Sequence, residues 1–182
     1  MKWFSGLVLC LVIGLAYSQE DEDVDYLSPY YCYLDKVFQY KWNADYSGGW
    51  CQHEPKIAKY QIQAAEECKT GFADTARKYH DNLSAVCSND LKDIEGDCDS
   101  MMFTDPGEEC FADYFAEYQK PGANPFDVVA MERALCKHFD KMMTCHYTKI
   151  AERCKNYYHL FLRVMEPYRE LQHSVCAIIP SP

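Results

Sequence analysis

The sequence lacks the short motifs that would mark a common catalytic or metal site. No two cysteines stand at the Cys-x2-4-Cys spacing of a zinc site, and neither His-Glu-x-x-His nor Gly-x-Ser-x-Gly occurs. Basic residues are few, 18 against 28 acidic ones, and the formal net charge of −10 disfavours nucleic acid and anionic membranes. We therefore expect no catalytic residue, no metal, no cofactor, and no nucleic-acid or membrane partner.

Long apolar runs are also missing, apart from residues 7–15, and that run is too short to span a bilayer. It follows a positive start at Met1-Lys2 and precedes the small residues of Ala16-Tyr17-Ser18, which suit a signal peptidase. We expect residues 1–18 to be a signal peptide, cleaved before Gln19, and the product to be secreted and extracellular. Residues 19–26 are predicted to be an acidic disordered leader, and residues 27–182 a single domain.

Cysteine is abundant instead. Loss of Cys10 with the signal peptide leaves an even number of cysteines, ten of the 11. They can form five disulfides with no free thiol in an oxidising compartment. The predicted disulfide cysteines are Cys32, Cys51, Cys68, Cys87, Cys98, Cys110, Cys136, Cys145, Cys154 and Cys176. Their pairing is not fixed by the sequence.

No segment alternates with a period of two, whereas apolar residues recur every three or four positions along most of the chain. The predicted fold class is all-α, a single disulfide-stapled helical domain of five to seven helices. The clearest stripe of such apolar residues would form one face of a long helix, or of two helices that meet at Gly71. The stripe comprises Ile57, Tyr60, Ala64, Cys68, Phe72, Ala76, Tyr79, Leu83 and Val86.

Helix ends are predicted from turn and capping residues. A first helix is expected near Pro29 to Asn43, and helical sequence resumes after Pro55. Asp105-Pro106-Gly107-Glu108 and Asn124-Pro125-Phe126-Asp127 each offer a capping side chain followed by proline, and Lys120-Pro121-Gly122 ends the helix between them.

The stretch after Asp127 holds neither glycine nor proline until Pro167, where we expect a kink or a restart. A single helix of that length would be unusual, so a turn near Thr144 to Thr148 or near Asn156 is predicted. Cys136, Cys145 and Cys154 are nine residues apart, about 13.5 Å along a helix, which is too far for a mutual disulfide. If the segment is helical, Cys145 faces away from the other two, and all three bond to other elements.

The run Cys136-x8-Cys145-x8-Cys154-x21-Cys176 resembles the secreted helical cysteine-rich domain of unknown function found in nematodes and arthropods. This resemblance covers about the last third of the chain and implies a helical, disulfide-linked fold. The Cys-x8-Cys spacing is also similar to insect odorant-binding proteins. Those proteins carry an earlier Cys-x3-Cys pair that this chain lacks, so their ligand pocket is not inferred here.

Few polar residues suggest a site. Asn82-Leu83-Ser84 is a glycosylation sequon, which makes the product a candidate glycoprotein at Asn82. His80-Asp81 has the composition of half a catalytic dyad, but neighbours on a helix are expected to point apart. The acids between Asp90 and Asp105 do not form an EF-hand.

These features favour a secreted, non-enzymatic binding protein. It would be a monomer that presents a disulfide-locked helical surface or groove to an extracellular protein or a small apolar ligand. The alternatives are an extracellular structural or matrix component and a hydrolase with an unrecognised site, because two catalytic carboxylates can come from anywhere in a fold.

Overall fold

The computed structural model describes residues 28–44, 50–89, 98, 108–120, 124 and 127–180. The predicted signal peptide, the acidic leader, the outermost residues of the predicted domain and most of the segment from Asp90 to Asp105 lie outside these ranges. Within them the protein is all-α, with six α-helices, no strand and five disulfides. This confirms the predicted fold class and number of helices.

The first helix, α2 (Pro29–Trp42), begins as predicted, with proline at its first position and the Ser28 hydroxyl accepting a hydrogen bond from the Tyr31 N–H at 3.4 Å. The next helix, α3 (Trp50–Glu67), starts before Pro55 rather than after it, so this boundary was predicted wrongly. Proline removes one backbone donor inside the helix. The Cys51–Cys87 disulfide ties the first turn of α3 to α4, which helps to hold the part of the helix that precedes Pro55.

The predicted stripe forms two helices, because α3 ends at Glu67 and α4 (Ala73–Asn89) starts after a turn. Gly71 lies in that turn with φ +85, and a Cβ there would meet nothing within 4 Å, so only the backbone conformation favours glycine. Every stripe residue is buried except Tyr60, whose ring stacks on Tyr40 at 4.6 Å.

The second part of the chain contains η1 (Glu108–Phe111), α6 (Ala112–Tyr118), α7 (Val128–Arg153), η2 (Lys155–Tyr157) and α8 (Tyr158–Cys176). The predicted helix after residue 107 thus opens with a 3-10 turn, and its predicted N-cap, Asp105, lies outside the described residues. The N-cap of α7 is Asp127 rather than Asn124, because the Asp127 carboxylate accepts from the Ala130 N–H at 2.8 Å.

The expected turn at Thr144 to Thr148 does not occur, and α7 runs on to Arg153. Both threonine hydroxyls donate to the carbonyl four residues earlier, at 2.8 and 2.9 Å, and so fit within a continuous helix. The break comes at η2, which contains Asn156, the other predicted position. The restart at Pro167 is also wrong, because α8 continues through this buried proline.

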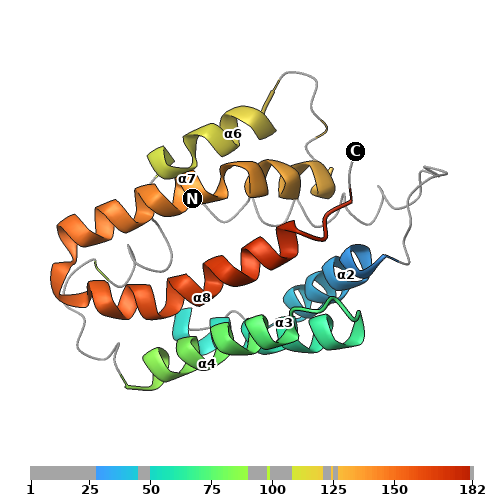
Figure 1. Cartoon of the computed structure of the whole chain (residues 1–182), viewed down its shortest axis with the longest axis horizontal. Helices are drawn as coiled ribbons and strands as arrows, with labels where there is room; N and C mark the ends of the chain where they lie inside the picture. Colours follow the sequence, from blue (N-terminus) through green and yellow to red (C-terminus); the bar gives the residue numbers. More distant parts are fainter. Residues whose placement is uncertain are drawn as a thin grey trace.

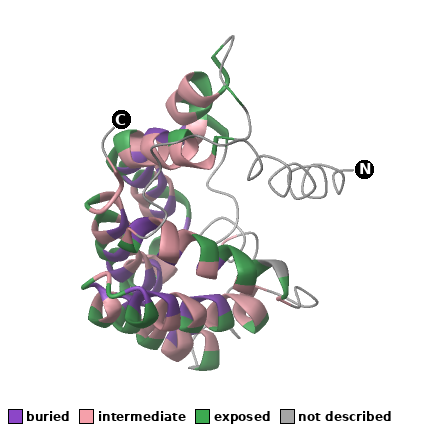
Figure 2. Ribbon diagram, turned by 90° about the vertical axis from the view of Figure 1, so that its right-hand side faces the viewer, coloured by how far each residue is buried: buried purple, intermediate pink, exposed green. Residues whose placement is uncertain are grey.

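The helices form layers around α8, which packs against α4 on one side and α7 on the other (Figure 1). Helices α3 and α2 follow beyond α4, and α6 lies on the outer side of α7. Buried residues face the inside of this arrangement, and α6 carries none (Figure 2). Within the described ranges no helix combines the length and the apolar character that crossing a membrane requires.

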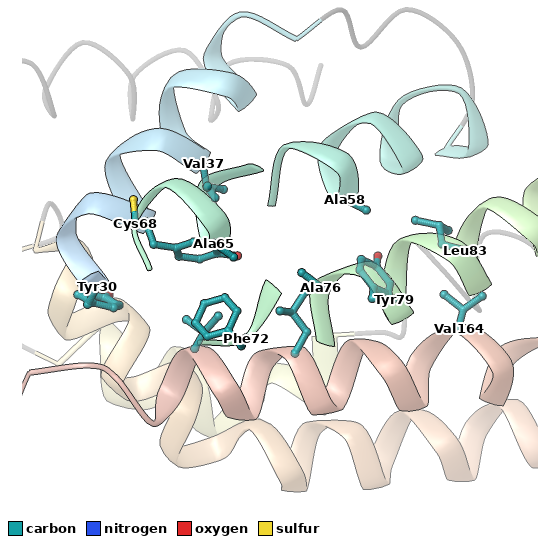
Figure 3. Packing of buried hydrophobic residues seen from close by; sticks show 14 of the residues in the cluster. Tyr30, Val37, Ala58, Ala65, Cys68, Phe72, Ala76, Tyr79, Leu83 and Val164 are labelled. Atoms are coloured by element: carbon teal, nitrogen blue, oxygen red, sulfur yellow. The ribbon is translucent and has the colours of Figure 1, made fainter. Parts of the chain in front are cut away.

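The main core lies between α2, α3 and α4 on one side and α8 on the other. Figure 3 shows Ala76, Tyr79 and Leu83 in a row along α4, with Val164 of α8 nearby. Leu83 and Val164 have no exposed area. A smaller cluster surrounds Phe161 where α7 meets α8.

The five disulfides divide the chain into two covalently closed parts. Cys32–Cys68 and Cys51–Cys87 lie within residues 28–89, which we call the N-terminal unit. Cys98–Cys154, Cys110–Cys145 and Cys136–Cys176 lie within residues 98–180, the C-terminal unit. None of the five joins the two units, so their contact is held by non-covalent packing.

The pairing confirms the prediction made for the long helix. Cys136, Cys145 and Cys154 bond to Cys176, Cys110 and Cys98, and none bonds to another of the three. Cys136 reaches α8 and Cys145 reaches η1, which lie on opposite sides of α7 as the half-turn between them requires.

Candidate functional site

One surface hollow lies between the end of α6 and the first half of α7. Its volume is about 440 Å³, within the range of small-molecule sites. It is lined by Glu117, Tyr118, Lys120, Asn124, Asp127, Ala130, Arg133, Ala134 and Lys137. The floor includes the buried Ala134, and charged groups surround it. The lining of this hollow therefore combines apolar and polar groups.

Most charges around this hollow are already paired. The Glu117 carboxylate lies 2.6 Å from both the Lys137 ammonium and His138 Nε2, and these two bonds lower the pKa of Glu117 to about 2. The Arg133 guanidinium donates twice to the Pro180 carbonyl, at 2.8 and 3.2 Å. A charged ligand would therefore have to compete with contacts inside the protein.

Helix α6 is held on α7 by a disulfide and by charges rather than by a core. In η1, which leads directly into α6, Cys110 bonds to Cys145 and Glu109 pairs with Lys149, while Asp113 of α6 itself pairs with Lys141. Helix α6 has only seven residues, none buried. Its surface is aromatic: the Tyr114 and Tyr118 rings stack at 6.0 Å, and Phe115 is 39% exposed.

A second hollow of about 430 Å³ lies at the other end of α7 and is shallower. It is lined by Thr144, Tyr147, Thr148, Ala151, Glu152, Lys155 and Tyr158. Burial and the neighbouring Glu166 raise the pKa of Tyr147 above its usual range. This hollow contains no acid–histidine pair and no cluster of cations, so it suggests no chemistry of its own.

The structure corrects the expectation for His80 and Asp81. The His80 Nδ1 lies 2.9 Å from an Asp81 carboxylate oxygen, and its Nε2 lies 3.4 Å from the Ser84 hydroxyl. The two neighbours do contact each other, since the side chains bend along the helix surface, and the order is that of an acid, a base and a nucleophile. All three residues lie within α4, whose interior N–H groups bond to its own carbonyls, so this helix supplies no oxyanion donor.

The sequon residue Asn82 is half-buried in the middle of α4, and its amide nitrogen donates to the Lys78 carbonyl at 2.9 Å. Attachment of a glycan would have to break this bond. Glycosylation at Asn82 stays a prediction.

No metal site emerges from the described ranges, where no group of three or more metal-ligating side chains converges. The buried His146 instead packs its ring on Phe161 at 4.7 Å. The acids between Asp90 and Asp105 lie outside the described residues.

Two half-buried carboxyl groups, one in each unit, had no signal in the sequence. Glu54 of α3 accepts a hydrogen bond from the Tyr79 hydroxyl at 3.4 Å, and Glu132 belongs to α7. Burial is the largest influence on both and raises the pKa of each. The sequence pattern does not show that tertiary packing would cover part of either side chain.

Comparison with known proteins identifies no relative. No protein-family model, no curated protein and no solved structure matches the chain. The resemblance of the last four cysteines to the invertebrate cysteine-rich domain therefore stays a prediction, and the functional argument depends on the chain's own geometry.

Proposed function

We propose that this protein is a secreted, non-enzymatic binding protein, a monomer that presents the α6 side of its disulfide-locked helices to an extracellular partner or a small apolar ligand. Pairing of all ten predicted cysteines supports an oxidising compartment, since cytosolic thiols are kept reduced. The predicted signal peptide, residues 1–18, supports secretion from the sequence side.

The observation that carries the proposal is the way α6 is held. Ordering a residue costs about 1–2 kcal/mol of backbone entropy, which burial normally offsets. Helix α6 has no fully buried residue; the Cys110–Cys145 disulfide fixes the η1 turn that leads into it, and ion pairs hold α6 itself. A helix fixed in this way contributes little to the core. Its fixed position instead keeps Tyr114, Phe115 and Tyr118, and the hollow beside them, in a constant geometry for a partner.

Two exposed phenylalanines provide a matched test. Phe115 on α6 and Phe38 on α2 are similarly exposed, at 39% and 36%. We expect Phe115→Ser to abolish binding of a fluorescent apolar probe such as anilinonaphthalene sulfonate, and to abolish capture of a partner from extracellular fluid. Phe38→Ser should leave both intact. Equal behaviour of the two variants would refute the α6 surface.

Sedimentation and solubility of the purified chain separate this proposal from the structural alternative. A soluble monomer supports the binding function, whereas covalently cross-linked, insoluble material supports a matrix component. N-terminal sequencing that begins at Gln19 would support secretion.

The hydrolase alternative has one specific observation in its favour, the hydrogen-bonded order of Asp81, His80 and Ser84. A fluorophosphonate probe should label Ser84 if His80 activates its hydroxyl. Ser174 is the matched control, because its hydroxyl donates to the Glu170 carbonyl and has no histidine partner. Equal labelling of Ser84 and Ser174 would remove this alternative.

A further inference from the structure

The hairpin formed by α7, η2 and the start of α8 is basic, although the chain as a whole is acidic. Residues 133–163 include seven basic side chains and two acidic ones, whereas the formal net charge of the whole chain is −10. Three of these cations, Lys137, Lys141 and Lys149, lie on α7 at steps of four and eight residues. Because four residues advance a helix by about 400°, the three form a slowly winding row along it, which we call the lysine row.

Acidic side chains at matching intervals cover the lysine row. Residues 108–118, which form η1 and α6 and which we call the acidic cover, lie on the outer side of α7 (Figure 1). Each lysine of the row pairs with one acid of the cover, in reverse order along the chain: Glu109–Lys149, Asp113–Lys141 and Glu117–Lys137. The Cys110–Cys145 disulfide lies between the first two pairs. The two segments are therefore antiparallel, with their charges in register.

The acidic cover neutralises the lysine row without burying a core against it. Helix α6 has no buried residue, and the buried residue of η1 is Cys110. Exposed ion pairs contribute little to stability, so the disulfide is the main attachment of the cover. Opening of that bond would leave the lysine row facing solvent. Arg153, exposed in the last turn of α7, continues the row by a further four residues.

A row of separate cations on one helix favours a polyanion over a single anion. Each cation that contacts a polyanion releases a condensed counterion, so the gain adds along the row, whereas a lone carboxylate gains little from one exposed cation. The negative charge of the rest of the protein is largely screened beyond about 8 Å at physiological ionic strength. Because disulfides are typical of oxidising, extracellular surroundings, the polyanion that fits is a sulfated polysaccharide. This choice of ligand rests on the proposed secretion, whereas the uncovering of the row does not.

We propose that the lysine row is a binding site for a sulfated polysaccharide, that the acidic cover occupies it in the oxidised protein, and that reduction of Cys110–Cys145 by a dithiol uncovers it. A thiolate of the dithiol attacks the half-buried Cys145 Sγ, the bond between the two cysteines breaks, and Cys110 leaves as a thiolate. The second thiol then displaces Cys145 and closes the disulfide of the reductant. Two electrons and two protons thus pass from the dithiol to the two cysteines.

Heparin binding with and without the disulfide tests the uncovering. The oxidised wild type and the full-length variant Cys110→Ser/Cys145→Ser are titrated with heparin at several salt concentrations. We expect the variant to bind at least about tenfold more tightly at low salt, and its plot of log affinity against log salt to be steeper by about 0.7–0.9 for each cation uncovered. Cys136→Ser/Cys176→Ser removes a disulfide of similar loop length, leaves the cover attached and should behave like the wild type.

Neutralising the acidic cover tests the same site without breaking a disulfide. Three acids of the cover are replaced in Glu109→Gln/Asp113→Asn/Glu117→Gln, which should bind heparin more tightly than the wild type because the lysine row loses its acidic partners. The matched control has the same net charge but loses three exposed acids of the N-terminal unit, and it should keep the wild-type affinity: Glu66→Gln/Asp74→Asn/Asp81→Asn.

Lysine variants assign the binding to the row. Lys141→Gln and Lys149→Gln, added to Cys110→Ser/Cys145→Ser, should together remove most of its gain in affinity. Lys59→Gln, which changes an exposed lysine of α3, should leave that gain intact.

The proposal is overturned if Cys110→Ser/Cys145→Ser binds heparin no better than the wild type, or if the two lysine substitutions leave its gain intact. Binding of that variant to vesicles of anionic phospholipid but not to heparin would also overturn it and would assign the row to a membrane surface.

Partial reduction of the folded wild type tests the redox step and replaces the serine variant if that variant does not fold. After brief treatment with dithiothreitol and then iodoacetamide, Cys110 and Cys145 should be the first cysteines modified, and the modified protein should bind heparin more tightly. Earlier modification of another pair would overturn the redox step. None of these outcomes bears on the Phe115 test of the proposed function, which uses the oxidised protein with its cover in place.

Discussion

Removal of the Cys110–Cys145 disulfide should release α6 while the rest of the protein stays folded. Apart from this bond, α6 is held by partly exposed ion pairs such as Lys141–Asp113, each worth about 0–1 kcal/mol. A seven-residue helix is far shorter than the ~12–15 residues that an isolated helix needs for even marginal stability. The disulfide is therefore the largest single term that keeps α6 in place.

The magnitude follows from the length of chain that the bond closes. Cys110 and Cys145 are 35 residues apart, and the loop-entropy relation gives about 4 kcal/mol for a loop of this length. That free energy corresponds to roughly a thousandfold change in an opening equilibrium. In the double variant Cys110→Ser/Cys145→Ser, amides of α6 should exchange with solvent up to about that much faster. Amides of α4 and α8, which belong to the main core, should keep their protection.

Hydrogen exchange followed by mass spectrometry measures both regions in one sample. The matched control is Cys136→Ser/Cys176→Ser, which removes a bond of similar loop length between α7 and α8. This control should leave α6 protected, because it does not touch the contact between α6 and α7. Unchanged protection of α6 without Cys110–Cys145 would refute the reasoning, as would equal loss of protection in the control.

Three further predictions concern the core, the acid limb of stability and the thiols. Leu83→Ala should lower the free energy of unfolding by about 2–5 kcal/mol, because Leu83 is fully buried. Asp81→Ala on the exposed face of the same helix should change it by less than about 0.5 kcal/mol. Urea unfolding of both variants measures the two changes. The pKa of Glu117 is lowered to about 2, so its contribution to stability is present above its usual pKa of 4.5 and is lost as the pH falls toward 2. The free energy of unfolding of Glu117→Gln should therefore fall less with decreasing pH over this range than that of the wild type. An identical pH dependence of the two proteins would argue against the Glu117 ion pairs. Finally, the denatured but unreduced protein should take up no alkylating reagent by intact-mass analysis, and ten reactive thiols would contradict the disulfide pairing.

Local patterns in the sequence were sufficient to predict most helices. The three-to-four-residue spacing of apolar residues from Ile57 to Val86 predicts helix and its buried face, because helical geometry alone places such residues on one side; whether they form one helix or two was left open. The spacing of Cys136, Cys145 and Cys154 excluded bonds among them for the same reason. The helical spacing of apolar residues after Pro29 predicted α2, and the structure adds the Ser28 cap.

The errors lie where local rules compete with tertiary contacts. Pro55 and Pro167 both lie inside helices, although proline by itself favours a break. Packing on both sides of each proline maintains the helix, and in α3 the Cys51–Cys87 disulfide adds to it. The dyad of His80 and Asp81 was misjudged because backbone spacing does not fix the rotamers of exposed side chains.

The sequence by itself determined an all-helical protein with ten cysteines available for disulfides, since helix periodicity and cysteine count are local properties of the chain. Only the tertiary structure decided which cysteines pair, and hence that the protein consists of two covalently closed units in non-covalent contact. It alone left α6 without a buried residue. These features depend on distances between residues far apart in the chain, which arise only when α8 packs between α4 and α7.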